Sequence, residues 1–138
     1  MANKLSFSDF QKFLDTFHGE KWIDFKRDLL PQIRSIIADT MKAVSGKIDP
    51  NMRSNTFEIF GYDFMIDEDF KIYLIEVNTN PCLDQWCPLL SRVIRSMLEN
   101  ALMIWLDPMF IPPEGFLSKK SINHDFWKTN RFELIFCS

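Results

Sequence analysis

Two strand-like segments joined by a short polar turn restrict the fold of this chain more than any other feature. Residues 56–66 are rich in Phe, Ile and Tyr, and residues 71–78 read Lys-Ile-Tyr-Leu-Ile-Glu-Val-Asn. The residues between them, 67–70, are polar and have the length of a hairpin loop. The two segments therefore predict an antiparallel hairpin, assigned to residues 56–78.

The N-terminal segment, residues 1–46, is predicted to be helical because its apolar residues recur at helical spacing. Ser8 and Gln11 form a possible capping box for the first helix, and Gly19 is expected to end it. Pro31 is well placed to open a further helix, since proline is comfortable in a first helical turn. Several helices are therefore available to cover the hairpin.

A second strongly apolar helix is predicted over residues 88–106, where Pro88 would open it. The remainder, residues 114–138, is expected to be an irregular tail that contains a short strand at 132–136. With its hairpin and helices, the chain is assigned to the α+β class as one partial domain over residues 1–138.

The composition excludes several classes of function. Sixteen basic and nineteen acidic residues give a net charge of −3, which argues against binding nucleic acid or membranes through bulk charge. The four glycines are too far apart for a phosphate-binding glycine loop, and the three cysteines contain no CxxC pair. No apolar stretch has membrane-spanning length, and the N-terminus lacks a signal-peptide pattern. The expected protein is cytosolic, with reduced thiols.

Strand alternation places three oxygen-bearing side chains together. A four-residue loop would pair Ile66 with Lys71 and Gly61 with Glu76, because the register of a hairpin follows from its loop. Asp63, Glu76 and Asn78 then share one face of the hairpin. The other face would be almost wholly apolar, made of Phe60, Tyr62, Phe64, Tyr73, Ile75 and Val77.

These three side chains have the donor chemistry of a magnesium site. Mg²⁺ favours oxygen ligands and typically takes one or two carboxylates together with substrate phosphates. Gly61 would leave room for such a ligand opposite Glu76. An edge hairpin with solvated acids remains an alternative interpretation. A Mg²⁺-dependent nuclease fits the acidic residues but not the acidic net charge.

The same residues carry a resemblance to a known family. Residues 57–67 and 74–81, with supporting similarity at 4–11, 87–90 and 106–110, resemble the signature of the tubulin–tyrosine ligase and ligase-like family. The resemblance implies the C-terminal part of an ATP-grasp domain. It also implies an ATP- and Mg²⁺-dependent ligase that adds tyrosine, glutamate or glycine to tubulin through an acyl phosphate.

The resemblance also implies which residues and molecules take part. Asp63, Glu76 and Asn78 match the metal-binding positions of the family, where they would hold Mg²⁺ on the phosphates of ATP. The partners would be the acidic C-terminal tail of tubulin and a free amino acid. The location would be the cytoplasm and cytoskeleton, with cilium and basal body as further places. Whether α- or β-tubulin is the acceptor stays open.

The chain is shorter than a whole ligase domain of that family. The family's ATP-gripping lysines lie in an N-terminal part that nothing here replaces, and Lys42, Lys47 and Lys71 are interpreted as surface lysines. The resemblance therefore implies an incomplete C-terminal fragment with little or no activity by itself. The alternative is a noncatalytic interaction module, or a degenerate paralogue that retains the hairpin as a scaffold.

Overall fold

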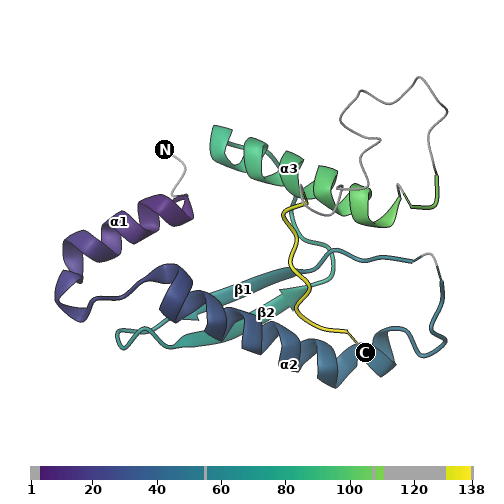
Figure 1. Cartoon of the computed structure of the whole chain (residues 1–138), viewed down its shortest axis with the longest axis horizontal. Helices are drawn as coiled ribbons and strands as arrows, with labels where there is room; N and C mark the ends of the chain where they lie inside the picture. Colours follow the sequence, from purple (N-terminus) through teal and green to yellow (C-terminus); the bar gives the residue numbers. More distant parts are fainter. Residues whose placement is uncertain (1–3, 55, 107, 111–129, 138) are drawn as a thin grey trace. The chain divides into compact units, whose positions relative to one another are not determined.

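The computed structural model describes residues 4–54, 56–106, 108–110 and 130–137 (Figure 1). The chain divides into two compact units, residues 1–83 with 135–138, and residues 84–134. In chain order the elements are α1 (Phe7–Phe17), the 3-10 helix η1 (Gly19–Lys21), the π-helical segment η2 (Phe25–Leu29), α2 (Leu30–Ile48), β1 (Gly61–Ile66), β2 (Ile72–Asn78) and α3 (Pro88–Trp105). The α+β class is confirmed. None of these helices is both long and apolar enough to cross a membrane.

The start of α1 differs from the predicted capping box. The N-cap is Ser6, whose Oγ accepts a hydrogen bond from the backbone N–H of Asp9 at 3.1 Å. Ser8 lies inside the helix, and the side chain of Gln11 accepts a hydrogen bond from the backbone N–H of Phe25 at 2.7 Å. The prediction placed the N-cap two residues too late. Ser6 and Ser8 are each followed three residues later by an acidic or amide residue, so the sequence pattern of a capping box fits both.

The core of the first unit lies where α1, η2 and the hairpin meet. Its buried side chains are Leu14, Phe25, Leu29, Phe70 and Ile72. Burying an apolar side chain of this size contributes about 1.5–3 kcal/mol each. The core therefore attaches the hairpin to the helices through Phe70, which lies in its turn, and Ile72, which begins β2. Figure 1 shows α2 running along the two strands.

Gln32 of α2 joins the helix to the hairpin by hydrogen bonds. Its Nε2 donates to the backbone carbonyls of Asp28 at 2.9 Å and Phe70 at 3.1 Å. Its Oε1 accepts a hydrogen bond from the backbone N–H of Ile72 at 3.0 Å. Farther along the same helix, the hydroxyls of Thr40 and Tyr62 lie 3.0 Å apart. These bonds give the hairpin a defined position on α2.

The hairpin turn closes one residue later than predicted. The N–H of Asp67 donates to the carbonyl of Lys71 at 3.1 Å, so the loop proper is Glu68, Asp69 and Phe70. Phe70 has a positive φ of 61°, as expected at the last position of a three-residue hairpin loop. Ile66 consequently pairs with Ile72 and not with Lys71.

This register corrects the predicted apolar face. The pairs Ile66 with Ile72, Phe64 with Leu74 and Tyr62 with Val77 place these six residues on the face that contributes to the core. Tyr73 pairs instead with Met65 and is 45% exposed, and Ile75 is 56% exposed. The assignment of Tyr73 and Ile75 to the apolar face is therefore wrong, because it assumed a four-residue loop that pairs Ile66 with Lys71.

The outer limits of the predicted elements also differ in part. The first strand begins at Gly61 and not at residue 56, and α2 ends at Ile48, two residues beyond the predicted limit. The strand predicted at 132–136 is wrong, since residues 130–137 contain none. The backbone N–H groups of Arg131 and Phe132 donate to side-chain oxygens instead of to a neighbouring strand. Residues 111–129 of the predicted tail lie outside the described part.

In the second unit, the prediction of a helix opened by Pro88 is confirmed. Helix α3 has Cys87 as its N-cap, proline in its first turn and no acidic residue there. Ile94 is its buried residue. The carbonyl and amide oxygens of Asn100 accept hydrogen bonds from Asn130 and Arg131 at 2.9 and 2.8 Å, so the segment at 130–132 is attached to this helix.

Candidate metal centre

A β-bulge brings the two predicted carboxylates opposite each other. Without it, the observed turn would pair Asp63 with Ile75 and leave Glu76 on the other face. The register shifts between Asp63 and Phe64, so that Ile75 is left over and Asp63 pairs with Glu76. After the bulge, Gly61 pairs with Asn78. The shared face of Asp63, Glu76 and Asn78 is therefore present, although it arises from a different register.

The three side chains meet at the amide nitrogen of Asn78. This Nδ2 donates to Asp63 Oδ2 at 3.0 Å and to Glu76 Oε1 at 3.2 Å. Asp63 and Glu76 are exposed and Asn78 is half-buried, so the cluster opens to solvent. Two carboxylate oxygens thus converge on one point that carries the partial positive charge of an amide N–H₂ group.

This donor set fits a hard divalent cation. A cation could take the place of the amide N–H₂, and a half-turn of the Asn78 amide would present its oxygen as a third ligand. Mg²⁺ typically uses only one or two protein carboxylates and keeps several other oxygen ligands from water or phosphate. No group of three or more His, Cys, Asp or Glu side chains in the described residues could hold a metal ion. The cluster is thus an open, carboxylate-and-amide site and not an all-protein cage.

The predicted role of Gly61 is wrong. The glycine lies opposite Asn78, not Glu76, and the space beside it is filled by the chain itself. A Cβ atom on Gly61 would lie 2.8 Å from Cβ of Pro81 and 3.7 Å from Cβ of Asn78. The glycine therefore allows the segment after β2 to turn closely past β1, next to Asn78.

The surroundings of the two carboxylates carry no compensating cation in the described part of the chain. The described ion pairs join Lys12 to Asp9, Arg27 to Asp28, and Arg53 to Asp49, and none includes Asp63 or Glu76. Lys42, Lys47 and Lys71 are exposed, as expected for surface lysines. Lys71 lies over the ring of Tyr73 at 5.0 Å from its centroid. The Asn78 amide is thus the partner that Asp63 and Glu76 share.

Two residues that position this site were not identified from the sequence. Gln32 connects α2 to the turn side of β2, and Ile75 is the extra residue of the bulge. Gln32 could have been found, because its spacing from Leu29 and Ile36 puts a polar side chain on the core-facing side of a helix. Ile75 carries no comparable signal, since an isoleucine is equally suited to a regular strand.

Comparison with known proteins gives the family of the chain. The family described as "Tubulin-tyrosine ligase family" matches residues 1–114, a range that includes the hairpin and all three clustered side chains. The chain belongs to the tubulin-tyrosine ligase family. The resemblance noted in the sequence is therefore confirmed, and it covers α1, α2, the hairpin and α3.

Members of the tubulin-tyrosine ligase family with curated names match a shorter range. The chain is 34% identical over 83 residues to tubulin glycylase 3D of Tetrahymena thermophila, which covers 60% of the chain and 8% of that protein. It is 37% identical over 79 residues to tubulin glycylase 3A of Drosophila melanogaster, covering 57% and 8%. It is 29% identical over 79 residues to human protein monoglycylase TTLL8, covering 57% and 9%. The matched segment thus spans about a tenth of each relative's length.

Proposed function

We propose that this chain contributes the metal-binding hairpin of an ATP- and Mg²⁺-dependent ligase that adds glycine to a carboxylate of tubulin. Membership of the tubulin-tyrosine ligase family supports ligation. The names of the relatives, which are tubulin glycylases and a monoglycylase, favour glycine over tyrosine and glutamate and favour tubulin as the acceptor. The observation that carries the proposal is the convergence of Asp63 and Glu76 on Asn78.

The chemistry required of these residues is electrostatic. In the proposed reaction, an oxygen of the acceptor carboxylate takes the γ-phosphoryl group of ATP, which gives an acyl phosphate and ADP. The amine nitrogen of glycine then attacks the acyl carbon, phosphate leaves, and an amide bond forms. Bound Mg²⁺ would neutralise negative charge on the phosphates during phosphoryl transfer.

Some residues of the chain would bind Mg²⁺ in this proposal, and others position those residues. Asp63 and Glu76 supply two negative charges on neighbouring strands, and Asn78 supplies a neutral oxygen after its amide turns. The bulge at Ile75 places the two carboxylates opposite each other, and Gln32 attaches the hairpin to α2. The backbone therefore determines the geometry of the ligands before any cation binds.

The test is incorporation of radiolabelled glycine into tubulin in the presence of ATP and Mg²⁺. It is carried out with the chain as it stands and with any longer polypeptide that contains it, because the chain by itself is expected to have little activity. We expect Asp63→Asn and Glu76→Gln each to reduce incorporation by about tenfold or more, since each removes a charged ligand.

Asp84→Asn is the matched control, because Asp84 is an exposed carboxylate outside the cluster. It should leave glycine incorporation unchanged. If incorporation proceeds equally well in Asp63→Asn and Glu76→Gln, the hairpin has no role in ligation. The alternative of a noncatalytic interaction module would then be favoured. Replacing glycine with tyrosine or glutamate in the same assay tests the choice of amino acid.

A further inference from the structure

The two ends of the hairpin are held on the helices in different ways. The described apolar side chains of the hairpin that belong to the core, or pack against it, all lie on the turn side of the bulge: Phe64, Ile66, Phe70 and Ile72. On the other side of the bulge, Tyr62 pairs with Val77, which is 37% exposed. A polar contact therefore has more influence on the end of the hairpin that carries Asp63.

The bulge separates the two ends mechanically as well. A β-bulge bends its strand and increases the local twist, so pairing on one side of it does not fix the direction of side chains on the other. Asp63 and Glu76 are the first pair beyond the bulge. The hydrogen bonds of Gln32 reach Phe70 and Ile72, which lie on the turn side. A contact beyond the bulge bears more directly on the orientation of Asp63.

Tyr62 makes such a contact with Thr40 of α2. Their hydroxyl oxygens are 3.0 Å apart, and the Thr40 hydroxyl also donates to the carbonyl of Ile37 at 2.9 Å. Because a threonine hydroxyl has one hydrogen, both bonds form together only if Tyr62 is the donor to Thr40. The Tyr62 ring stacks on Phe64, with centroids 5.9 Å apart, which orients the hydroxyl toward the helix.

We propose that Tyr62 is a positioning residue for the cation site, and that its hydrogen bond to Thr40 sets the orientation of Asp63. Successive residues of a strand point to opposite faces, so a Tyr62 ring fixed against α2 directs the neighbouring Asp63 outward. Val77, the partner of Tyr62, lies between Glu76 and Asn78. The inference rests on the proposed function, since it concerns the residues that would hold Mg²⁺ there.

The experiment follows the NMR signals of the Asn78 side-chain amide in the full chain, first without Mg²⁺ and then during a Mg²⁺ titration at constant ionic strength. This amide donates to both carboxylates, so its signals report the geometry of the cluster before any cation binds. We expect Tyr62→Phe to shift the signals without Mg²⁺. It should also raise the Mg²⁺ dissociation constant by about threefold, less than the roughly tenfold loss typical of a group that bonds a metal ligand directly.

Thr40 offers a second way to remove the same hydrogen bond. Thr40→Val should reproduce the effects of Tyr62→Phe, whereas Thr40→Ser keeps the hydroxyl and should retain the original affinity. Tyr62→Phe/Thr40→Val should raise the dissociation constant no more than either single substitution, because both remove one shared bond. If the two increases multiply in the double variant, the bond between the hydroxyls does not explain them and the proposal is overturned.

The other tyrosine of the chain supplies the matched control. Tyr73→Phe removes the same hydroxyl from the turn side of the hairpin, where the Tyr73 side chain bonds to Asp67. It should leave the Asn78 signals and the dissociation constant unchanged. Thermal unfolding of each variant separates positioning from stability. A merely structural role of Tyr62 would lower the unfolding midpoint and leave the Mg²⁺ affinity of the folded chain unaltered, which would overturn the proposal.

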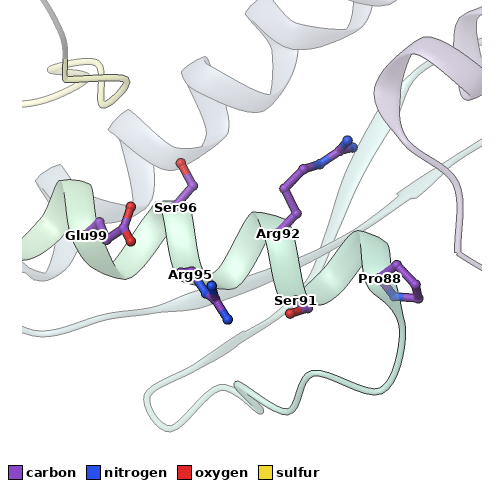
Figure 2. A pocket seen from close by; sticks show the side chains of 6 residues that line it. All are labelled: Pro88, Ser91, Arg92, Arg95, Ser96 and Glu99. Atoms are coloured by element: carbon purple, nitrogen blue, oxygen red, sulfur yellow. The ribbon is translucent and has the colours of Figure 1, made fainter.

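Glu99→Gln is the control for Mg²⁺ bound elsewhere on the chain. Glu99 is an exposed carboxylate of α3, in the other unit, and Figure 2 shows it among the side chains that line an open pocket on that helix. Its removal should not change the dissociation constant measured at Asn78. An equal increase in Glu99→Gln and in Tyr62→Phe would overturn the inference, because the effect would not be specific to the hairpin.

Failure of the proposed function is distinguishable from failure of this inference. If the Asn78 signals of the unaltered chain do not respond to Mg²⁺, the proposed cation site is wrong. A shift of these signals in Tyr62→Phe without Mg²⁺ would in that case still support the role of Tyr62 in positioning Asp63. If Mg²⁺ binds but Tyr62→Phe and Thr40→Val change neither the signals nor the affinity, this inference alone is wrong.

Discussion

At the scale of single residues, close contacts and local hydrogen bonds determine which substitutions the site tolerates. Gly61 and Pro81 illustrate this most directly. From the sequence, Gly61 is interpreted as leaving room for a ligand. The atoms nearest to a Cβ at this position, however, belong to the chain itself. Such a contact between residues 20 positions apart cannot be read from composition or spacing. It depends on where the segment after β2 goes.

We therefore expect Gly61→Ala to destabilise the chain by about 1–3 kcal/mol, the usual cost of overpacking. The added Cβ would lie 2.8 Å from Cβ of Pro81, and the proline ring cannot rotate away. Urea denaturation measures the change. Gly46→Ala is the control, since nothing lies within 4 Å of a Cβ there and the position is in α2. The control should stabilise the chain by about 0.5–1 kcal/mol, and an equal response at both positions would contradict the contact.

The carboxyl group of Asp28 gives a pH-dependent prediction. Two hydrogen bonds lower the pKa of Asp28 from 3.8 to about 2. The larger effect comes from the Arg27 guanidinium and the next from the backbone N–H of Asp24. Because the pKa is lower in the folded chain, the stabilisation from this carboxylate is present above pH 3.8 and is lost as the pH falls through about 2.

NMR titration of the Asp28 side-chain carbonyl measures this pKa. In Arg27→Gln we expect the pKa to rise toward 3.8, while the backbone hydrogen bond keeps it below that value. Lys26→Gln should leave it unchanged, since Lys26 is not among the groups that lower the pKa. A midpoint near 3.8 in the unaltered chain would contradict the hydrogen-bonded pair.

At the scale of elements, the site depends on how the hairpin is held on α2. Gln32 satisfies one backbone N–H and one backbone carbonyl at the edge of the hairpin turn, both partly buried. Helices and strands of the first unit were predictable because hydrophobic periodicity reports which face each element buries. The attachment between them was not, because it is made by a polar side chain whose partners are backbone atoms about 40 residues away.

Gln32→Leu should destabilise the chain by about 2 kcal/mol, because the N–H of Ile72 and the carbonyl of Phe70 lose their partner. Hydrogen exchange at the Ile72 amide should accelerate in parallel, and both effects can be followed on the same sample by NMR. Gln85→Leu is the matched control, since Gln85 is exposed and its side chain accepts a hydrogen bond from the Ser91 hydroxyl. Its effect should remain within about 0.5 kcal/mol. Similar losses at Gln32 and Gln85 would show that the hairpin is held by packing alone.

The register of the hairpin shows how far a sequence-based prediction of the site can go. The predicted shared face of the three clustered residues is present, but the prediction used a loop that is one residue too long. Phe70 occupies the position in the turn that has a left-handed backbone conformation. A glycine or asparagine there would have indicated the three-residue loop in the sequence, but a phenylalanine does not. The bulge at Ile75 then shifts the pairing by one further residue in the same direction, and a total shift of two residues puts Asp63 and Glu76 back on one face. The alternation of side chains along the two strands therefore did not by itself establish the face that Asp63 and Glu76 share.

At the scale of the whole molecule, the proposed cation site between two strands would link metal binding to folding. Asp63 and Glu76 are 13 residues apart in the chain and become neighbours only when the hairpin forms. A cation that uses both carboxylates binds the folded chain in preference to the unfolded chain. Its binding free energy therefore adds to the stability of the fold.

We accordingly expect Mg²⁺ at ten times its dissociation constant to raise the free energy of unfolding by about 1.4 kcal/mol. Thermal unfolding at matched ionic strength measures the increment. It should vanish in Asp63→Asn/Glu76→Gln and persist in Asp84→Asn, whose exposed carboxylate lies outside the cluster. Without Mg²⁺ the double variant should be at least as stable as the unaltered chain, because two like charges that share one amide have been removed. An equal Mg²⁺ increment in both variants would place the ion elsewhere on the acidic surface and leave the hairpin cluster without a metal.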